Sequence, residues 1–192
     1  MKKNCEPLVS IIINCFNGSQ YLKTTLLSII NQTYTNFEVI FWDNQSTDES
    51  KEIFLSYKDI RFKYFYAKNH TVLYKARNLA IEKSSGKYIA LIDTDDWWEP
   101  DKLRDQINKF REDNYALIYT NMNIVYQKKS RFGFIINWII SKLLSRKFCN
   151  IFAPQGFILR ELLYHYQVGL PSIVFKKEVF DSFNDNYHII GD

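Results

Sequence analysis

Cysteine, histidine and long apolar runs are scarce in this chain of 192 residues, and each scarcity excludes a class of protein. The three cysteines are odd in number and have no paired spacing, which argues against a disulfide framework or a CxxC zinc site and favours a reducing cytoplasm. His70, His165 and His188 lack metal-ligand spacing and are interpreted as packing or surface residues. The apolar run 8–13 is too short for a signal peptide and is interrupted by Ser10.

Hydrophobic residues make up 46% of the chain and charged residues 24%, a balance typical of a folded protein and not of a disordered one. The length suits one domain of ordinary size, or one domain with an extension. The net charge of +4 is unevenly distributed, because segment 128–147 contains six basic residues and no acidic residue. The basic character therefore belongs to one local surface.

Short β-branched and aromatic runs alternate with segments of helical periodicity along the first 120 residues. Strands are predicted over 9–13, 37–42, 61–66, 87–92 and 115–120. Helices are predicted from Ser19, from a capping box of Ser46 and Glu49 to about Tyr57, over about 71–84, and after Pro100. This alternation predicts an α/β fold, with a mostly parallel central sheet flanked by helices.

Polar side chains follow three of these strands. Asn14 and Asp43 end the first two, and the sequence LIDTDDWWEP at 91–100 places Asp93, Asp95 and Asp96 directly after the fourth. Ligands of parallel sheets bind beyond the carboxyl ends of the strands, so these side chains are expected at the rim of one crevice. Asp-x-Asp offers oxygen ligands to Mg²⁺ or Mn²⁺, ions that are commonly held together with substrate phosphates. In the alternative interpretation, the acids only stabilise the N-terminus of the following helix.

Several linked motifs between Pro7 and Leu103 resemble the family-2 glycosyltransferases with the GT-A fold. They read PLVSIIINCFN at 7–17, SIINQTY at 28–34, WDNQSTD at 42–48, ARN at 76–78, GKYI at 86–89 and DTDD at 93–96. The resemblance implies a Rossmann-like GT-A fold with a partly helical acceptor-side extension. It divides the chain into a donor-binding half, 1–120, and an acceptor-side half, 121–192.

The resemblance also implies metal-assisted transfer of a sugar from a nucleotide-diphosphate donor, with roles for individual residues. Asn14 and Phe16 would line the base pocket, Asp43 and Asn44 would contact the base, and Arg77 would lie near the nucleotide. Asp93 would approach the ribose, Asp96 would contribute to donor binding, and Asp95 would ligate Mn²⁺ or Mg²⁺. For Arg77 the alternative is a surface ion pair on its own helix.

The resemblance is imperfect at Asn44, where the family often has a second acid. An amide oxygen can still accept a hydrogen bond from the imide N–H of uracil or thymine, so UDP or dTDP is the favoured carrier.

The acceptor side is represented by 170–180, which resembles the family's acceptor-side strand and the short helix after it. Asp192, in the final Gly-Asp pair, would be the general base that takes the proton of the acceptor hydroxyl during an inverting attack. The alternative is a terminal residue without a role. Because family members normally continue beyond this point, the chain is expected to be truncated.

Segment 132–147 is apolar with flanking basic residues, but it is shorter than the roughly 20 residues that span a bilayer. One interpretation is a helix at an anionic membrane surface, which suits a lipid-linked acceptor, and the other is a helix packed on the core with solvated charges. Nucleic acid is not an expected partner, because Ile135, Ile136, Ile139 and Ile140 suit acyl chains better than phosphates.

The leading hypothesis is thus an inverting, metal-dependent glycosyltransferase of bacterial-type surface polysaccharide synthesis, cytoplasmic or peripheral on the inner face of the membrane. Its acceptor would be a glycan or a lipid-linked glycan. The first alternative is a catalytically silent sugar-nucleotide-binding module, favoured by Asn44 and the expected truncation. The second is a nucleotidyltransferase, which would need a glycine-rich phosphate loop where 14–18 has only Gly18.

Overall fold

Apolar strands buried on both faces form the centre of a mixed sheet. The computed structural model describes residues 6–122 and 169–183. In it β1 (Val9–Cys15) lies between β2 (Phe37–Asp43) and β4 (Tyr88–Asp93), and β3 (Phe62–Tyr66) flanks β2, all four strands running parallel. Nearly every residue of β1, β2 and β4 is buried, as continuous apolar runs in a parallel sheet require. The predicted α/β fold is confirmed.

Two strands complete the other side of the sheet. β5 (Leu117–Tyr119) and β6 (Ile173–Lys176) give the strand order β3-β2-β1-β4-β6-β5, and β6 pairs antiparallel with both β4 and β5. Two short 3₁₀ helices, η1 (Leu170–Ser172) and η2 (Lys177–Val179), flank β6. The segment expected on the acceptor side therefore supplies a strand of the same sheet.

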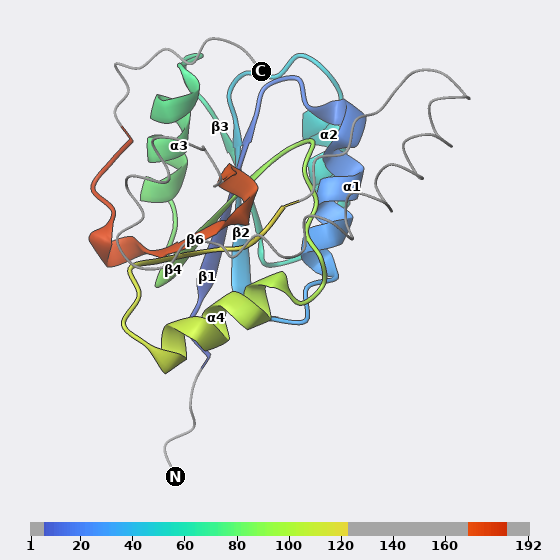
Figure 1. The fold of residues 1–192 in the computed structure, drawn as a ribbon. Helices are drawn as coiled ribbons and strands as arrows, with labels where there is room; N and C mark the ends of the chain where they lie inside the picture. Colours follow the sequence, from blue (N-terminus) through green and yellow to red (C-terminus); the bar gives the residue numbers. More distant parts are fainter. Residues whose placement is uncertain (1–5, 123–168, 184–192) are drawn as a thin grey trace, which may run out of the picture. The chain divides into compact units, whose positions relative to one another are not determined.

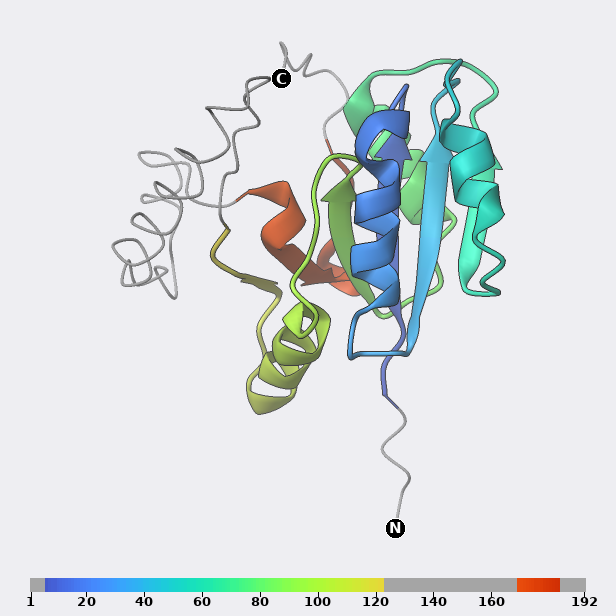
Figure 2. The ribbon, with the colours of Figure 1, turned by 90° about the vertical axis from the view of Figure 1, so that its right-hand side faces the viewer.

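Helices cover both faces of the sheet (Figures 1 and 2). One apolar cluster joins the odd-numbered side chains of β1 to α1 (Ser19–Ile30), α2 (Ser50–Ser56) and α4 (Lys102–Glu112). A second cluster, around Ile12, packs α3 (Leu73–Glu82) and Phe175 of β6 against the opposite face. In Figure 1 the sheet separates α3 on the left from α1 and α2 on the right.

The described residues from 6 to 119 and from 170 to 183 belong to one compact unit. Residues 120–169 are assigned to a second unit, of which 120–122 and Gly169 are described. The basic segment 128–147 and Asp192 lie outside the described residues. No helix within the described ranges has the length and apolarity needed to cross a membrane.

The start of α2 differs from the predicted capping box of Ser46 and Glu49. Glu49 precedes the helix and makes no side-chain cap bond. Instead Asp48 accepts hydrogen bonds from two backbone N–H groups, that of Ser50 at 3.0 Å and that of Ser19, the first residue of α1, at 2.8 Å. Burial alone would raise the pKa of Asp48, but hydrogen bonds from Ser50 and Ser19 outweigh it and lower the pKa to about 2. One carboxylate thus caps two helices.

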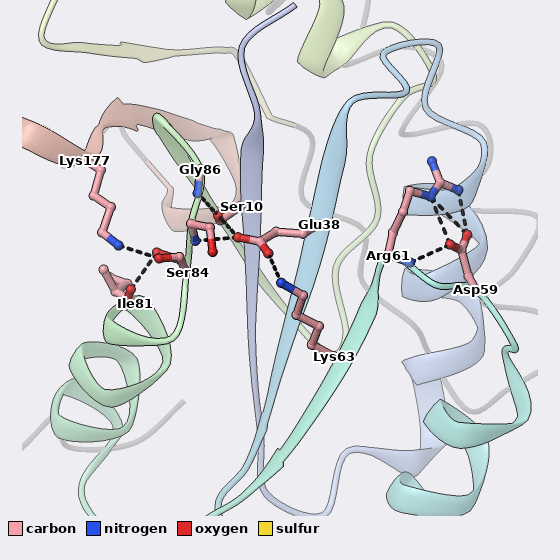
Figure 3. Close-up of polar contacts among 10 residues, drawn as sticks. Ser10, Glu38, Asp59, Arg61, Lys63, Ile81, Ser84, Gly86 and Lys177 are labelled. Carbon is pink, nitrogen blue, oxygen red and sulfur yellow. Dashed lines mark hydrogen bonds and ion pairs between the residues drawn. The ribbon is translucent and has the colours of Figure 1, made fainter.

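A second carboxylate, Glu38, is buried near the amino ends of the strands (Figure 3). It accepts hydrogen bonds from the Ser10 hydroxyl at 2.5 Å, the Lys63 ammonium at 2.6 Å and the Ser85 backbone N–H at 2.6 Å. Burial favours a raised pKa for Glu38, but these donors outweigh it and lower the pKa. The Ser10 hydroxyl also accepts from the Gly86 N–H, where an added Cβ would lie 2.6 Å from Ser10.

Replacing Glu38 with glutamine should lower the free energy of unfolding by about 1–3 kcal/mol, because an amide nitrogen would face Lys63 and the buried donors would lose a charged acceptor. Urea-induced unfolding at pH 7 measures this, with the exposed Glu49→Gln as matched control. Equal stability of the two variants would show that the buried carboxylate is not needed.

Replacing Asp48 with alanine should cost about 1–2 kcal/mol, because two helices lose their cap, and Asp48→Asn should cost less. The folded-state pKa lies below the ordinary value of 3.8, so the carboxylate stabilises the fold fully above that pH. The difference between wild type and Asp48→Ala should therefore be larger at pH 7 than at pH 3. Urea-induced unfolding at the two pH values checks the sign, and a difference that grows on acidification would contradict it.

Candidate functional site

The strand register brings three polar side chains into one row. Asn14 of β1 is paired with Trp42 of β2 on one side and with Asp93 of β4 on the other. Within the described residues, Asn14 Nδ2 and Trp42 Nε1 are buried donors without a hydrogen-bond partner. A buried donor left unpaired costs about 1–3 kcal/mol, so such a group commonly marks a place where a further acceptor binds. The row therefore contains two buried donors that no described residue satisfies.

Arg77 closes one end of this row. Arg77 lies on α3 and is only 5% exposed. Its guanidinium forms an ion pair with Asp93 in which Nη2 and Oδ1 are 2.9 Å apart. The alternative of a surface ion pair along the helix is therefore wrong, since the partner is on β4 and the arginine is buried. The pair fixes the orientation of Asp93, whose side chain stays 38% exposed.

Side chains of α1, and of Gln32 just after it, hold the backbone of the acidic loop 94–101 in place. The bonds join Thr25 Oγ1 to the carbonyl oxygens of Thr94 and Asp96, both at 2.8 Å, Ser28 Oγ to the Trp98 N–H at 3.1 Å, and Gln32 Nε2 to the Glu99 carbonyl at 2.7 Å. The Trp98 ring is buried, its Nε1 donates to the Pro171 carbonyl, and the Lys102 ammonium lies over its face. These contacts use backbone atoms of the loop, and they leave the side chain of Asp95 exposed.

The carboxylates of this loop differ in environment. Asp95 is exposed, and no hydrogen bond or ion pair joins its side chain to another described residue. Burial, together with the charges of Asp93 and Asp95, raises the pKa of the half-buried Asp96 to about 6. Among the described residues no group of three or more His, Cys, Asp or Glu side chains is arranged to hold a metal ion. A cation bound here would need further ligands beyond these side chains.

Asp43 is fully buried at the end of β2. One carboxylate oxygen accepts from the Ser46 N–H at 2.7 Å and the other from the Tyr64 hydroxyl at 2.6 Å. Burial, and then the bond to Asp43, raises the pKa of Tyr64. In this structure Asp43 holds the loop after β2, and its contact with a base stays a prediction.

Asn44 connects the loop after β2 to the loop after β3. Its Nδ2 donates to the Thr71 carbonyl at 2.7 Å, and its Oδ1 accepts from the Thr71 N–H at 3.2 Å and from the Thr71 hydroxyl at 3.3 Å. The side chain is almost fully buried. The amide therefore forms a reciprocal pair with one residue of the neighbouring loop.

An exposed aromatic pair lies beside this connection. Phe16, which follows β1 and is 55% exposed, meets His70 of the loop after β3 with ring centroids 4.5 Å apart. His70 Nδ1 lies 2.8 Å from the Asn44 carbonyl oxygen. His70 was predicted to be a packing or surface residue, but its position beside two predicted base-pocket residues was not predicted. No local pattern indicates it, because the three residues come from three separate loops.

The described residues therefore bring together Asn14, Phe16, Asp43, Asn44, Arg77, Asp93, Asp95 and Asp96 at the carboxyl ends of β1, β2 and β4 and in the adjoining loops and α3. Asp192 lies outside the described residues, and its predicted role stays a prediction.

Known proteins resemble the chain in sequence and in fold. It is 29% identical over 182 residues to WfgD of Escherichia coli, a UDP-Glc:alpha-D-GlcNAc-diphosphoundecaprenol beta-1,3-glucosyltransferase, which covers 93% of this chain and 64% of WfgD. Among solved structures, S. aureus TarS 1–349 in complex with UDP-GlcNAc superposes with a TM-score of 0.68 at 20% identity, over 88% of this chain and 45% of TarS. The mannosyltransferase PcManGT from Pyrobaculum calidifontis, in complex with GDP-Man and Mn²⁺, gives a TM-score of 0.56 at 19% identity, over 62% of this chain and 37% of PcManGT.

These likenesses show a GT-A-like fold, as predicted from the sequence motifs. The chain spans less than two thirds of the length of each of these relatives. The model of Glycosyl transferase family 2 matches residues 10–168, and the chain therefore belongs to this family.

Proposed function

We propose that the chain binds a nucleotide-diphosphate sugar and transfers the sugar, with inversion, to a glycan or lipid-linked acceptor in bacterial-type surface polysaccharide synthesis. The observation that carries the proposal is the row at the strand ends. It combines a buried unpaired donor on Asn14, an arginine-oriented carboxylate on Asp93 and an exposed carboxylate on Asp95. A protein that binds a sugar nucleotide needs hydrogen-bond donors for the base oxygens and an acceptor for the ribose hydroxyls. It also needs a ligand for the cation that the phosphates bind.

The names of the relatives support the choice of donor and acceptor. WfgD is named for UDP-Glc and a diphosphoundecaprenol-linked acceptor, and TarS was solved with UDP-GlcNAc. UDP is therefore the favoured carrier, with dTDP second because thymine shares the carbonyls and imide N–H of uracil. The proposed membrane contact of 132–147 would bring the protein to such a lipid-linked acceptor, and it rests on the sequence of that segment alone.

The carboxylate oxygens of the acidic loop suit a hard divalent cation. Mg²⁺ and Mn²⁺ prefer oxygen ligands and are often held by one or two carboxylates together with substrate phosphates, which agrees with a single unpaired Asp95 and with no three-ligand group in the described ranges. PcManGT was solved with Mn²⁺. Asp95 would hold the ion, which when bound would neutralise charge on the departing diphosphate.

The remaining roles follow from position and chemistry. Arg77 orients the partly exposed carboxylate of Asp93, which is proposed to accept from ribose hydroxyls, and Phe16 offers an exposed ring on which the base can stack. Asp192 is proposed to take the proton of the acceptor hydroxyl as its oxygen bonds to the anomeric carbon. The bond from that carbon to the phosphate oxygen breaks, and its electron pair leaves with the nucleoside diphosphate.

Calorimetric titration of the purified chain with UDP should show binding that requires Mn²⁺, and Asp95→Ala should weaken it at least about tenfold, or 1.4 kcal/mol. Asp105→Ala, which removes an exposed carboxylate from α4, is the matched control and should bind like the wild type. Separate titrations with dTDP and GDP test the choice of base. If the folded wild type bound none of the diphosphates, the proposed function would be refuted.

A further inference from the structure

Asp43 and Asn44, the two residues expected to contact the base, already have hydrogen-bond partners within the protein. Uracil presents an imide N–H between two carbonyl oxygens, so a pocket that selects it needs a hydrogen-bond acceptor opposite that N–H. Both carboxylate oxygens of Asp43 already accept bonds, and Asn44 Oδ1 already accepts from Thr71. The two residues expected to contact the base are therefore engaged in holding loops.

The contacts of Asn44 with Thr71 require an amide side chain at position 44. Thr71 presents both an N–H and a carbonyl oxygen to it, and an amide side chain satisfies both at once. An ionised aspartate accepts hydrogen bonds but donates none, so it would leave the Thr71 carbonyl without this donor. The asparagine thus fixes the loop that carries His70, at the expense of a free acceptor at position 44.

His70 has the free acceptor that the pocket needs. The Asn44 backbone oxygen can only accept, so Nδ1 at 2.8 Å must carry the hydrogen of that bond. In a neutral imidazole, a protonated Nδ1 leaves Nε2 with a lone pair that can accept a hydrogen bond. Across the described parts of the chain no further hydrogen bond involves the His70 ring. Contact with Phe16 limits rotation of the ring, which lies on the exposed side of the loop.

We infer that His70 recognises the base of the donor nucleotide. Its Nε2, beside the ring of Phe16, accepts a hydrogen bond from the imide N–H of uracil. This rests on the proposed function, which makes the Phe16 neighbourhood the base pocket. Cytosine has a lone pair at the ring nitrogen where uracil has its N–H, so two acceptors would face each other. His70 therefore selects for uracil through repulsion of cytosine as well as through attraction.

Comparison of UDP with CDP isolates this contact, because the two ligands share the ribose, the diphosphate and the metal. With Mn²⁺ present, calorimetric titration should show that the wild type binds UDP at least about tenfold more tightly than CDP. His70→Phe keeps a ring against Phe16 but removes both nitrogens, and it should reduce the preference to less than about threefold. His70→Ala should do the same, and thermal unfolding shows whether each variant is folded. The exposed Lys58→Ala, which lies before the amino end of β3 whereas His70 follows its carboxyl end, should keep the wild-type preference.

The outcomes separate the two proposals. Metal-dependent UDP binding whose preference over CDP is lost in both His70 variants supports the inference. If UDP binding depends on Mn²⁺ and Asp95 but both His70 variants keep the preference, the role of His70 is refuted and the proposed function stands. A wild type that binds UDP and CDP equally also refutes the role of His70. A folded wild type that binds neither refutes both proposals.

Discussion

The parallel register of β1 with its two neighbours is the constraint on which the site depends. Pairing of Asn14 with Trp42 and with Asp93 places three polar side chains in one row on one face of the sheet. Because side chains alternate between faces, a slip of β1 by one residue would turn Asn14 to the opposite face, away from Trp42 and Asp93. The apolar residues of β1 that alternate between the α1 side and the α3 side resist such a slip, so packing of the core and position of the site are set together.

Two kinds of contact then give the loops at the strand ends their shape. Polar side chains of α1, and Gln32 after it, hold the backbone of the acidic loop, and Asp43, Asn44 and Asp48 hold the loops after β2 and β3. Buried carboxylates and amides with all their partners in place make such loops rigid, whereas a single missing partner is costly. The site is thus held by buried polar groups, while Phe16, Asp95 and His70 are exposed.

The sequence predicts the parts of this architecture that depend on local pattern. Strands that are buried on both faces appear as continuous apolar runs, and polar residues at their ends indicate the edge where Asn14, Asp43 and Asp93 meet. Thr25, Ser28 and Gln32 could also have been recognised, because polar residues at spacings of three and four along α1 and just after it need partners where they are buried. Pairings between distant loops are different. The cap supplied by Asp48 to two helices, the insertion of β6 beside β4, and the meeting of Phe16 with His70 each depend on tertiary structure that no local spacing encodes.

Close packing between Gly18 and Thr94 joins the loop after β1 to the acidic loop. A Cβ at position 18 would lie 2.6 Å from Thr94 Oγ1, so the two positions share one small volume. A larger residue at 18 would displace Thr94 and move the neighbouring Asp95. In the evolution of this chain, positions 18 and 94 are therefore expected to covary, with a side chain at 18 tolerated only where residue 94 has become smaller.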